Sequence, residues 1–376
     1  MDQKQYVIIF STAYLPFLGG AEIAVKEITD RLHDMNFILI TARMRHHLPS
    51  RERIGNIEVY RVGMGIPFLD KVLSPFLAAW HVFILRRRIH VCLFWSVMVS
   101  YITITPVLLK MVGLCRNTPF LLTLQEGDSE THIVKGRFGL VAYWWRMSLY
   151  YANSVHVISA WLEKIARGFG YRGAIFVIPN GVDVAKFQIS DFNPSVKIII
   201  TTSRLVEKNA IDVLIKAFAK VHEIFPDVRL HIVGDGPLRS SMEILAHTLQ
   251  VDAAITFLGT MPNEEVPEQL AAAYMFVRPS RSEGLGISFL EAMAAGVPII
   301  ATPVGGIVDF LKDEETGLVC KVDDPQDLAI QIKKLFTNEA LYMRLQENGR
   351  RLVEERYNWD MIAERMKTMF KNLCIS

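Results

Sequence analysis

Two glutamates, Glu283 and Glu291, stand eight positions apart in the stretch "SEGLGISFLEAMAAGVPIIATPVGG", residues 282–306. Gly284 and Gly286 follow the first glutamate, and a run of small residues then leads into the apolar segment "VPII". Two carboxylates at a short spacing could form the acid/base pair of a glycoside hydrolase. A carboxylate can also accept two O–H donors from a vicinal diol. The residues alone leave both kinds of site open.

Two cations mark a second segment, "TSRLVEKNAIDVL", residues 202–214. Arg204 and Lys208 come just after a predicted strand and just before a predicted helix. An arginine can hold a phosphate with its planar fork and a lysine adds a point charge, so the pair is a candidate phosphate clamp. Two solvated loop cations would give the same pattern, so the segment indicates a phosphate site without requiring one.

Glycine-rich loops are the third kind of candidate. Gly19 and Gly20 in "LPFLGGAEIAVKEI" lie between the first predicted strand and a helix. Backbone N–H groups and the helix dipole favour an anion such as a diphosphate at such a place. Gly234 in "GDGPLRSSME" follows another predicted strand in the same way. Each loop could equally be a tight turn, so neither establishes a ligand by itself.

Apolar runs alternate with helical patterns along the chain, which predicts βαβ units and parallel sheets. The predicted strands form two series: 6–11, 37–42, 57–62, 90–95, 120–125, 154–159 and 174–179, then 197–203, 228–234, 255–259, 272–280 and 298–302. These are too many strands for one sheet. We therefore predict an α/β protein with two Rossmann-like, doubly wound domains that face a central cleft, with ligands at the carboxyl ends of the strands.

A polar, proline-containing segment at 185–195 marks the predicted domain boundary. The N-terminal Rossmann-like domain should comprise residues 1–185, and the C-terminal Rossmann-like domain should comprise residues 186–355. A final segment, residues 356–376, is predicted to be helical.

Together these segments resemble the retaining GT-B glycosyltransferases of family four, the group 1 glycosyl transferases, which include sucrose synthases and mannosyltransferases. The resemblance covers nearly the whole chain, through "LGGAE", "SRLVEKN", "VGDGP" and the terminal helix after "YNW". Its most specific part is "PSRSEGLGISFLEAMAAGVPIIAT", residues 279–302. It implies that the first domain serves the acceptor, that the second binds the donor, and that residues 356–376 pack back on the first.

The resemblance implies a binding site for a nucleoside diphosphate sugar. Glu283 would face the hydroxyls of the donor sugar, and Glu291 would accept hydrogen bonds from the nucleotide ribose. This assignment argues against an acid/base pair, because the second carboxylate then lies at the ribose. The implied donor-binding residues also include Gly19, Gly20, Gly234, Gly284, Leu285 and Gly286.

Arg204 and Lys208 would hold the diphosphate, and with Glu283 they would form the catalytic group of residues. Negative charge that develops on the leaving phosphate would be stabilised by these prepositioned cations. The resemblance therefore implies catalysis without a divalent metal and without any other cofactor.

The chain departs from the family pattern on the acceptor side. The strand at 120–125 usually ends in a histidine in this family, but here it ends in Gln125, which cannot act as a base. We assign the acceptor side to Gln125, Glu126 and Asp128. Gln125 would position a hydroxyl while the donor phosphate takes the proton, or one of the two carboxylates would serve as the base.

Three further positions differ from the family or lack an explanation. Ser203 and Asn209 stand where the family has glycines beside the two cations. Asn tolerates left-handed backbone angles, so we expect a mild change at Asn209, whereas Ser203 leaves less room for a phosphate. Arg281, just before the glutamate stretch, has no explanation from the sequence.

The composition limits the class of protein. The chain has 376 residues with a 51% hydrophobic composition, which is enough for two α/β cores. Its cysteines are scattered, which argues against a disulfide framework and a zinc site and favours a reducing cytosol; they are Cys92, Cys115, Cys320 and Cys374. The N-terminal apolar run is too short for a signal peptide, so we expect a cytoplasmic protein.

The charge is unevenly distributed. Residues 1–185 hold 20 Lys and Arg against 13 Asp and Glu, and residues 43–116 alone hold 11 against 3. This excess predicts peripheral contact with the anionic inner face of a membrane, although a solvated basic face is the alternative. No nucleic-acid-binding motif accompanies the charge. Residues 89–109 are long enough to cross a bilayer, but we predict that they divide into a strand and a helix.

We therefore expect a metal-independent, retaining, hexosyltransferase-type glycosyltransferase. It would move a UDP- or GDP-linked sugar to a hydroxyl of a lipid-linked or oligosaccharide acceptor. One alternative is a nucleotide-sugar epimerase of the same fold, which would need no acceptor. The other is a non-catalytic nucleotide-sugar-binding partner of a membrane assembly; Gln125 keeps this alternative open, while Glu283, Glu291, Arg204 and Lys208 argue against it.

Overall fold

The computed structural model describes residues 4–17, 19–128, 133, 139–187 and 197–375. The chain forms two compact units. Unit 1 comprises Met1–Asn180 together with Trp359–Ser376, and unit 2 comprises Gly181–Asn358. Most of the predicted boundary segment, residues 185–195, lies outside the described residues.

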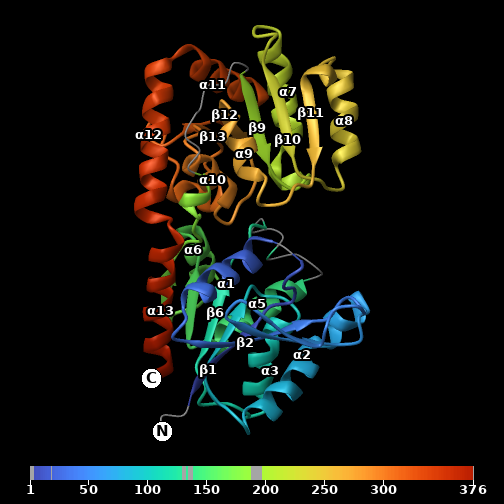
Figure 1. Ribbon diagram of the computed structural model, residues 1–376, viewed down its shortest axis with the longest axis vertical. Helices are drawn as coiled ribbons and strands as arrows, with labels where there is room; N and C mark the ends of the chain where they lie inside the picture. The colour runs from blue at the N-terminus through green and yellow to red at the C-terminus, as the bar shows by residue number, and fades with distance from the viewer. Residues whose placement is uncertain (1–3, 18, 129–132, 134–138, 188–196, 376) are drawn as a thin grey trace. The chain divides into compact units, whose positions relative to one another are not determined.

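Unit 1 contains an eight-stranded sheet in the order β3-β4-β2-β1-β5-β6-β7-β8 (Figure 1). Neighbouring strands are parallel, except that β3 runs antiparallel to β4. The strands are β1 (Gln5–Phe10), β2 (Asn36–Ala42), β3 (Arg51–Ile54), β4 (Ile57–Val62), β5 (His90–Val97), β6 (Phe120–Leu124), β7 (Ser154–Val157) and β8 (Ala174–Val177). The predicted first series of strands is confirmed. Only β3 was not predicted, because its sequence "RERI" has little apolar signal.

The helices of unit 1 lie between these strands, as expected for βαβ units. They are α1 (Gly20–Arg31), α2 (Pro67–Leu85), α3 (Thr105–Met111), α5 (Leu140–Tyr151), α6 (Ala160–Gly168) and α13 (Trp359–Ile375), with a short 3-10 helix η1 (Ile102–Ile104). Residues 89–109 form β5, η1 and the start of α3, which confirms their division into strand and helix. Among the described residues, one helix is long and apolar enough to cross a membrane, and it is α2.

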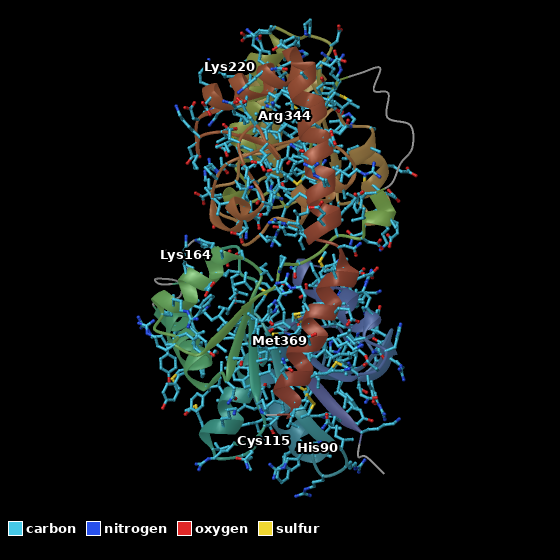
Figure 2. All side chains as sticks on the ribbon, turned by 90° about the vertical axis from the view of Figure 1, so that its left-hand side faces the viewer. His90, Cys115, Lys164, Lys220, Arg344 and Met369 are labelled. Carbon is cyan, nitrogen blue, oxygen red and sulfur yellow. A yellow bond between two sulfur atoms is a disulfide. The ribbon has the colours of Figure 1, made fainter. Side chains whose placement is uncertain are left out.

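The last helix of the chain completes the core of unit 1. Trp95 on β5 donates its indole N–H to Thr123 Oγ1 at 2.7 Å, and its ring lies 4.9 Å from the ring of Phe370 on α13. Met369 on α13, labelled in Figure 2, is also buried. The apolar face of α13 therefore belongs to the same core as β5, although the two are far apart in the sequence.

A disulfide joins the same two elements. Cys92 on β5 and Cys374 on α13 are bonded, with their Cα atoms 4.9 Å apart, whereas Cys115 and Cys320 are free. The prediction that the cysteines do not pair is therefore wrong for Cys92 and Cys374. They are 282 positions apart, and spacing along the chain could not show that α13 returns to β5. The argument from scattered cysteines to a reducing cytosol loses its support at this pair.

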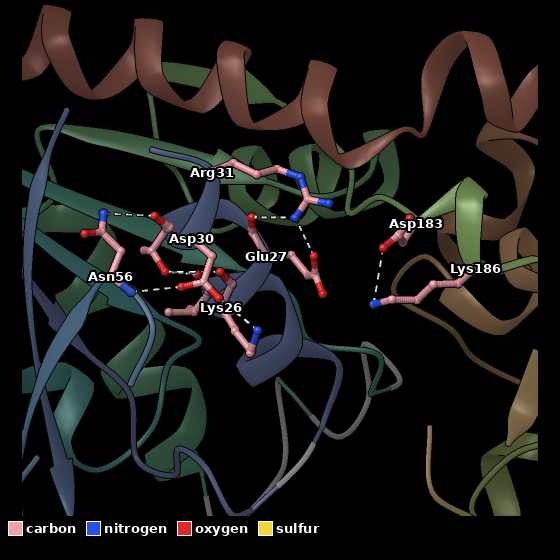
Figure 3. A network of polar contacts seen from close by, with 9 residues as sticks. Lys26, Glu27, Asp30, Arg31, Asn56, Asp183 and Lys186 are labelled. Atoms are coloured by element: carbon pink, nitrogen blue, oxygen red, sulfur yellow. Dashed lines mark hydrogen bonds and ion pairs between the residues drawn. The ribbon is translucent and has the colours of Figure 1, made fainter. Parts of the chain in front are cut away.

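Polar contacts fix α1 within unit 1 (Figure 3). Near the end of this helix, Asp30 accepts hydrogen bonds from Lys26 Nζ at 2.8 Å and from the backbone N–H of Asn56 at 3.0 Å. Arg31 donates to Asp360 on α13 at 2.6 Å. These contacts tie α1 to the turn between β3 and β4 and to α13, and so they position Gly20 at the start of the helix.

Unit 2 contains a six-stranded, all-parallel sheet in the order β11-β10-β9-β12-β13-β14. The strands are β9 (Ile198–Thr202), β10 (Arg229–Val233), β11 (Ile255–Gly259), β12 (Met275–Arg278), β13 (Ile299–Ala301) and β14 (Leu318–Val319). The predicted second series is confirmed, and only the two-residue β14 was not predicted. Buried side chains of α7, such as Leu214 and Phe218, pack in one core with those of β9 and β10.

The helices of unit 2 connect and cover these strands. They are α7 (Ile211–His222), α8 (Arg239–Thr248), α9 (Val266–Ala271), α10 (Ile287–Ala294), α11 (Pro325–Thr337) and α12 (Glu339–Arg356). The 3-10 helices are η3 (Val184–Phe187), η4 (Glu207–Asn209), η5 (Asp252–Ala254) and η6 (Gly305–Asp309). Both units are therefore α/β with mostly parallel sheets.

Candidate functional site

The candidate residues of unit 2 follow the carboxyl ends of adjacent parallel strands. Strands β10, β9 and β12 are neighbours in the sheet. Gly234 follows β10, Arg204 and Lys208 follow β9, and Glu283 follows β12. Since the carboxyl ends of parallel strands meet at one edge of the sheet, these residues share the edge at which such sheets bind ligands.

Glu283 is held by a buried arginine that the sequence analysis missed. Arg278, the last residue of β12, donates from Nη2 to Glu283 Oε2 at 2.7 Å. The other carboxylate oxygen, Oε1, accepts the backbone N–H of Gly284 at 3.0 Å. An arginine inside the apolar strand "YMFVRPS" was the available signal, because a buried charge needs a partner. The two bonds orient the carboxylate before any ligand binds.

Arg278 also binds the surrounding loops. It is 5% exposed, and it donates to Ser288 Oγ at 2.8 Å, to Ser280 Oγ at 3.1 Å and to the carbonyl of Thr202 at 3.3 Å. Its guanidinium lies over the ring of Phe289, 4.5 Å from the centroid. Arg278 thus connects the end of β9, the loop after β12 and the first turn of α10 around Glu283.

Two glycines shape the backbone around Glu283. Gly286 caps α10 with a φ of 88°, and a Cβ there would lie 2.6 Å from the ring of Phe289. Gly305 has a φ of 55°, and a Cβ there would lie 1.8 Å from the carbonyl oxygen of Glu283. Left-handed angles and the lack of space together require glycine at both positions. The neighbouring Leu285 is buried in the unit.

Glu291 stands on α10, one helix turn beyond Ile287, and is half-buried. Burial raises the pKa of Glu291 to about 7, and the positive charge of Arg278 opposes this shift. Burial lowers the pKa of Arg278, against the effect of Glu283 and Glu291. Because Glu291 titrates near neutral pH, a ligand that needs its ionised form would bind in a pH-dependent way.

The loop after β9 that carries Arg204 and Lys208, here called the cation loop, holds its two basic residues in different environments. Arg204 is exposed, and its guanidinium pairs with no residue in the part of the chain that the structure describes, whereas Lys208 is partly buried in η4. The amide of Asn209 donates to the carbonyl of Arg204 at 2.6 Å. The left-handed backbone that we associated with Asn209 occurs instead at Ala210, with a φ of 53°. The Ser203 hydroxyl is buried and has no partner among the described residues.

The structure explains Arg281. Its side chain donates to Asp323 at 2.6 Å, to Asp212 on α7 at 3.0 Å and to the carbonyl of Glu207 at 2.6 Å. Its backbone N–H donates to the carbonyl of Lys208 at 2.7 Å. Arg281 therefore fastens the cation loop to the loop that carries Glu283.

Gly234 is required by the close approach of two loops. It has a φ of 124°, and its N–H donates to the carbonyl of Gly259 at 2.7 Å. A Cβ on Gly234 would lie 2.0 Å from the carbonyl oxygen of Ser203. The glycine thus allows the loops after β9 and β10 to touch.

The glycine pair of unit 1 lies at the start of α1. Gly20 is the first residue of the helix and Gly19 is its N-cap. A Cβ on Gly19 would lie 2.6 Å from Glu22 Oε2, so the glycine makes room for this side chain. Burial raises the pKa of Glu22, while the backbone N–H groups of Glu22 and Gly19 oppose the shift. A phosphate at this helix end would meet a carboxylate, which the sequence analysis did not anticipate.

Gln125 follows β6 and has an unsatisfied amide. Its Oε1 accepts a hydrogen bond from Asn180 Nδ2 at 3.1 Å. Its Nε2 is buried and has no acceptor among the described residues. Buried donors in proteins almost always have a partner, so this nitrogen is suited to an acceptor atom of a ligand, such as a hydroxyl oxygen.

The two acidic neighbours of Gln125 differ from each other. Glu126 is buried, and its two oxygens accept the backbone N–H groups of Val99 at 2.7 Å and Gln125 at 2.9 Å. Burial raises the pKa of Glu126 to about 7, and the charge of Asp128 adds to the shift. Asp128 is exposed. Glu126 therefore holds the ends of β5 and β6 together, which favours a structural role over that of a base.

The candidate residues include no metal-ligating cluster. Within the described ranges, no three His, Cys, Asp or Glu side chains gather closely enough to hold a metal ion. The charge of the Glu283 carboxylate is balanced by the guanidinium of Arg278.

Comparisons with known proteins point to one family. The model for glycosyl transferases group 1 matches residues 184–352. A GDP-mannose-dependent monoacylated alpha-(1-6)-phosphatidylinositol monomannoside mannosyltransferase from Corynebacterium glutamicum is 31% identical over 230 residues, which cover 56% of this chain and 60% of that protein. An uncharacterized glycosyltransferase from Methanocaldococcus jannaschii is 25% identical over 392 residues, which cover 97% of this chain and 98% of that protein.

A solved structure extends the likeness to the fold. The structure of sucrose-phosphate synthase from Thermosynechococcus elongatus superposes with a TM-score of 0.85 at 22% identity, over 98% of this chain and 99% of that one. By contrast, the chain matches only about half of the length of the first curated relatives, from 43% to 60%.

Proposed function

We propose that this chain is a retaining glycosyltransferase of the group 1 family, because its residues 184–352 match the model of that family and its fold is GT-B. The donor is a sugar linked to UDP or GDP, and the acceptor is a hydroxyl of a lipid-linked substrate or an oligosaccharide. The name of the Corynebacterium relative specifies a GDP-mannose donor and a phosphatidylinositol mannoside. This name supports the donor class and favours a lipid-linked acceptor.

The observation that carries the proposal is the set of charges at the carboxyl edge of the sheet in unit 2. The exposed Arg204 and the nearby Lys208 can neutralise a diphosphate. Glu283, oriented by Arg278, is ready to accept hydroxyl donors of the sugar. Glu291, on the following helix, is assigned to the ribose. Two cations that stand in place before reaction stabilise the negative charge on the leaving phosphate.

The proposed chemistry uses the leaving group as the base. In a transfer with retention, the acceptor oxygen arrives on the face from which the phosphate leaves. As the bond from the sugar carbon to the phosphate oxygen breaks, that oxygen takes the acceptor's proton, and the new glycosidic bond forms. Gln125 Nε2 would donate to the acceptor hydroxyl oxygen. The engagement of both Glu126 oxygens with backbone N–H groups supports this route over a Glu126 base.

The remaining parts of the proposal concern cofactor and location. We infer that the reaction needs no divalent metal, because arginine and lysine side chains can supply the positive charge. We place the protein in the cytoplasm, with peripheral contact at the inner face of the membrane through the basic excess of residues 43–116.

The test is an assay with labelled donors, with and without candidate acceptors and in the presence of EDTA. We expect acceptor-dependent release of nucleoside diphosphate that EDTA does not abolish. Release with conversion of the sugar to its epimer and no need for acceptor would identify an epimerase. Donor binding without turnover under any acceptor would identify a non-catalytic binding protein.

A thermal-shift screen of UDP, GDP, ADP and their sugars would choose the donors for that assay. A ligand at roughly 100 times its dissociation constant should add about 2.7 kcal/mol to the free energy of unfolding. The nucleotide that gives the largest shift would identify the base, and a further shift with its sugar would identify the donor.

A further inference from the structure

Helix α2 presents a long apolar face to the solvent. Phe68, Phe76 and Trp80 are 72%, 64% and 63% exposed. Further exposed apolar side chains lie before, on and near the end of the helix, namely Met64, Ile66, Leu69, Val72, Leu73, Leu77 and Ile84. A contiguous apolar face of this length is unusual on a soluble monomer and marks an interaction surface. The helix packs beside α3 (Figure 1).

The opposite face of α2 is built into unit 1. Ser74, Pro75, Ala78 and Val82 are buried, and the helix packs against β2 and β4. Asp70, in the first turn, is 1% exposed. Its carboxylate accepts the backbone N–H groups of Met44 at 3.1 Å, Met64 at 2.8 Å and Gly65 at 2.7 Å.

This anchoring decides between two ways of meeting a membrane. The helix has 19 residues and is apolar enough to cross a bilayer by length and composition. A crossing helix would have to leave the sheet and carry Asp70 into lipid without its three backbone donors, which is energetically unfavourable. A helix that stays packed on the sheet can enter a bilayer only with its axis parallel to the membrane surface.

The charges around α2 favour an anionic surface. Residues 59–125 contain a single acidic side chain, the buried Asp70, against seven Lys and Arg. The exposed Arg86–Arg88 directly follow the helix. The guanidinium groups of Arg86 and Arg87 lie 5.3 and 4.4 Å from the ring centroid of Phe83, which stacks on Trp80 at 5.8 Å.

The arginines and aromatic rings at the end of α2 lie where its last turn meets the start of β5. Arg86 donates to Cys115 Sγ at 3.5 Å, and Figure 2 shows Cys115 and His90 together at one end of unit 1. Cations therefore border the aromatic end of the apolar face, as in helices that lie at the surface of anionic membranes.

We propose that α2 is an interfacial membrane helix, whose apolar face from Phe68 to Ile84 lies among the acyl chains of an anionic bilayer, with Arg86–Arg88 at the phosphate groups. The inference does not depend on the transferase activity, because it is tested by binding to lipid alone. A protein partner would also cover an apolar face. The lack of exposed acidic residues in the sequence segment 59–125, and the arginines at the aromatic end of the face, favour lipid phosphate.

The apolar face of α2 is a different membrane-contact surface from the one expected from charge alone. Arg43 donates to the carbonyls of Leu48 and His46, Arg51 pairs with Glu58, and Arg53 donates to the carbonyl of Gly55. These arginines take part in contacts within unit 1. The main determinant should therefore be the apolar face of α2 rather than the basic residues at 43–53.

The test is flotation of the full-length protein with vesicles of phosphatidylcholine, with and without phosphatidylglycerol. We expect Phe76→Ser combined with Trp80→Ser to weaken binding roughly a hundredfold, because two large apolar side chains no longer enter the acyl region. The matched control is Ile244→Ser combined with Ile330→Ser, which removes apolar side chains that are 67% and 53% exposed on unit 2. The control should bind like the wild type.

A second variant tests the charges. Replacing Arg86, Arg87 and Arg88 with Gln should abolish the preference for phosphatidylglycerol and its weakening by salt, with a loss of roughly a hundredfold on anionic vesicles at low salt. Melting curves that match the wild type would show that the variants remain folded.

Three results would overturn the proposal. Equal flotation of the wild type and the Phe76/Trp80 variant would show that the apolar face does not enter lipid. Binding that resists carbonate and yields only to detergent would indicate a spanning helix. Absence of vesicle binding, together with a self-association that the Phe76/Trp80 variant abolishes, would assign the face to a second copy of this chain.

Discussion

The strand-end loops of the two units differ in how they use charge. In unit 2, the arginines Arg278 and Arg281 are bound on several sides and hold Glu283 and the cation loop in place. In unit 1, the corresponding loop after β6 offers the neutral amide of Gln125, and the oxygens of the adjacent Glu126 are both occupied by backbone N–H groups.

This difference underlies our proposal that unit 2 binds the donor and unit 1 the acceptor. A fixed network with an exposed cation at its edge suits a charged ligand such as a diphosphate, because the charges need no reorganisation when the ligand arrives. A buried amide nitrogen with no acceptor among the described residues, such as Nε2 of Gln125, suits a neutral hydroxyl. Loss of a charge in unit 2 should therefore have large effects, and changes at the loop of unit 1 should have small ones.

The largest effect is expected for Arg278. Arg278→Ala should lower the free energy of unfolding by about 3–5 kcal/mol, because it leaves the Glu283 carboxylate without its buried partner. Arg281→Ala is the matched control: its ion pairs are more exposed, so it should cost about 1 kcal/mol or less. Urea denaturation measures both. A double variant that also removes Glu283 should recover part of the loss, and no recovery would contradict the pairing.

Arg204 should have the next largest effect. Arg204→Ala should reduce turnover by about 10²–10³ while the protein remains as stable as the wild type, by analogy with deletion of one electrostatic stabiliser. Lys220→Ala removes an exposed cation near the end of α7 (Figure 2) and should leave turnover unchanged. Equal losses in the two variants would indicate a general effect of charge and not a phosphate clamp.

The pH dependence of nucleotide binding tests the assignment of Glu291 to the ribose. Its pKa is about 7 in the free protein, and a carboxylate that accepts two ribose hydroxyls must be ionised. Affinity should therefore fall by up to about tenfold per pH unit below pH 7, and binding should release protons. Calorimetry in two buffers measures this release. Glu291→Gln should remove the pH dependence, and a pH dependence that persists would assign it to another group.

The same raised pKa affects the stability of the free protein in the opposite direction. The raised pKa of Glu291 adds stability that is fully present below pH 4.5, the ordinary pKa of the group. This stability is lost as the pH rises through about 7, its pKa in the folded protein. The pKa of Glu126 is also raised to about 7, so this residue affects the pH dependence of stability in the same direction. Melting temperatures between pH 4.5 and pH 7 should therefore decline less in Glu291→Gln than in the wild type, and an unchanged slope would count against the raised pKa.

The smallest effect is expected at Gln125. Gln125→Ala should reduce turnover by well below the roughly 10²–10⁴ that is typical of losing a general acid or base. Asp128→Asn and Glu126→Gln should also retain turnover at saturating acceptor. A loss of roughly a thousandfold in either amide variant, with donor affinity intact, would identify a side-chain base and refute the phosphate route.

Much of the fold was predictable because its strands are local apolar patterns. The unpredicted β3 and β14 are a polar edge strand and a two-residue strand, and neither has such a pattern. The packing of α13 on β5, and with it the Cys92–Cys374 disulfide, joins segments that are 282 positions apart at the cysteines. No local signal specifies that contact.

The candidate site was predictable only where its residues form a contiguous motif. Arg281 had no explanation because its partners Asp212 and Asp323 are 69 and 42 positions away in the sequence. Arg278 was missed because it ends an apolar strand, where only the cost of burying a charge indicates a partner. The exposure of the apolar face of α2 could not be predicted from the sequence. An apolar helix is expected to be buried, and the sequence does not show which elements cover it.

The central claim is that unit 2 binds the donor with Glu283 at the sugar and Glu291 at the ribose. The most direct test is calorimetric titration of Glu283→Ala and Glu291→Ala with a nucleoside diphosphate and with its sugar. We predict that Glu291→Ala weakens both ligands alike, and that Glu283→Ala weakens the nucleotide sugar but leaves the free nucleotide almost unchanged. An equal effect of Glu283→Ala on the two ligands would contradict the assignment.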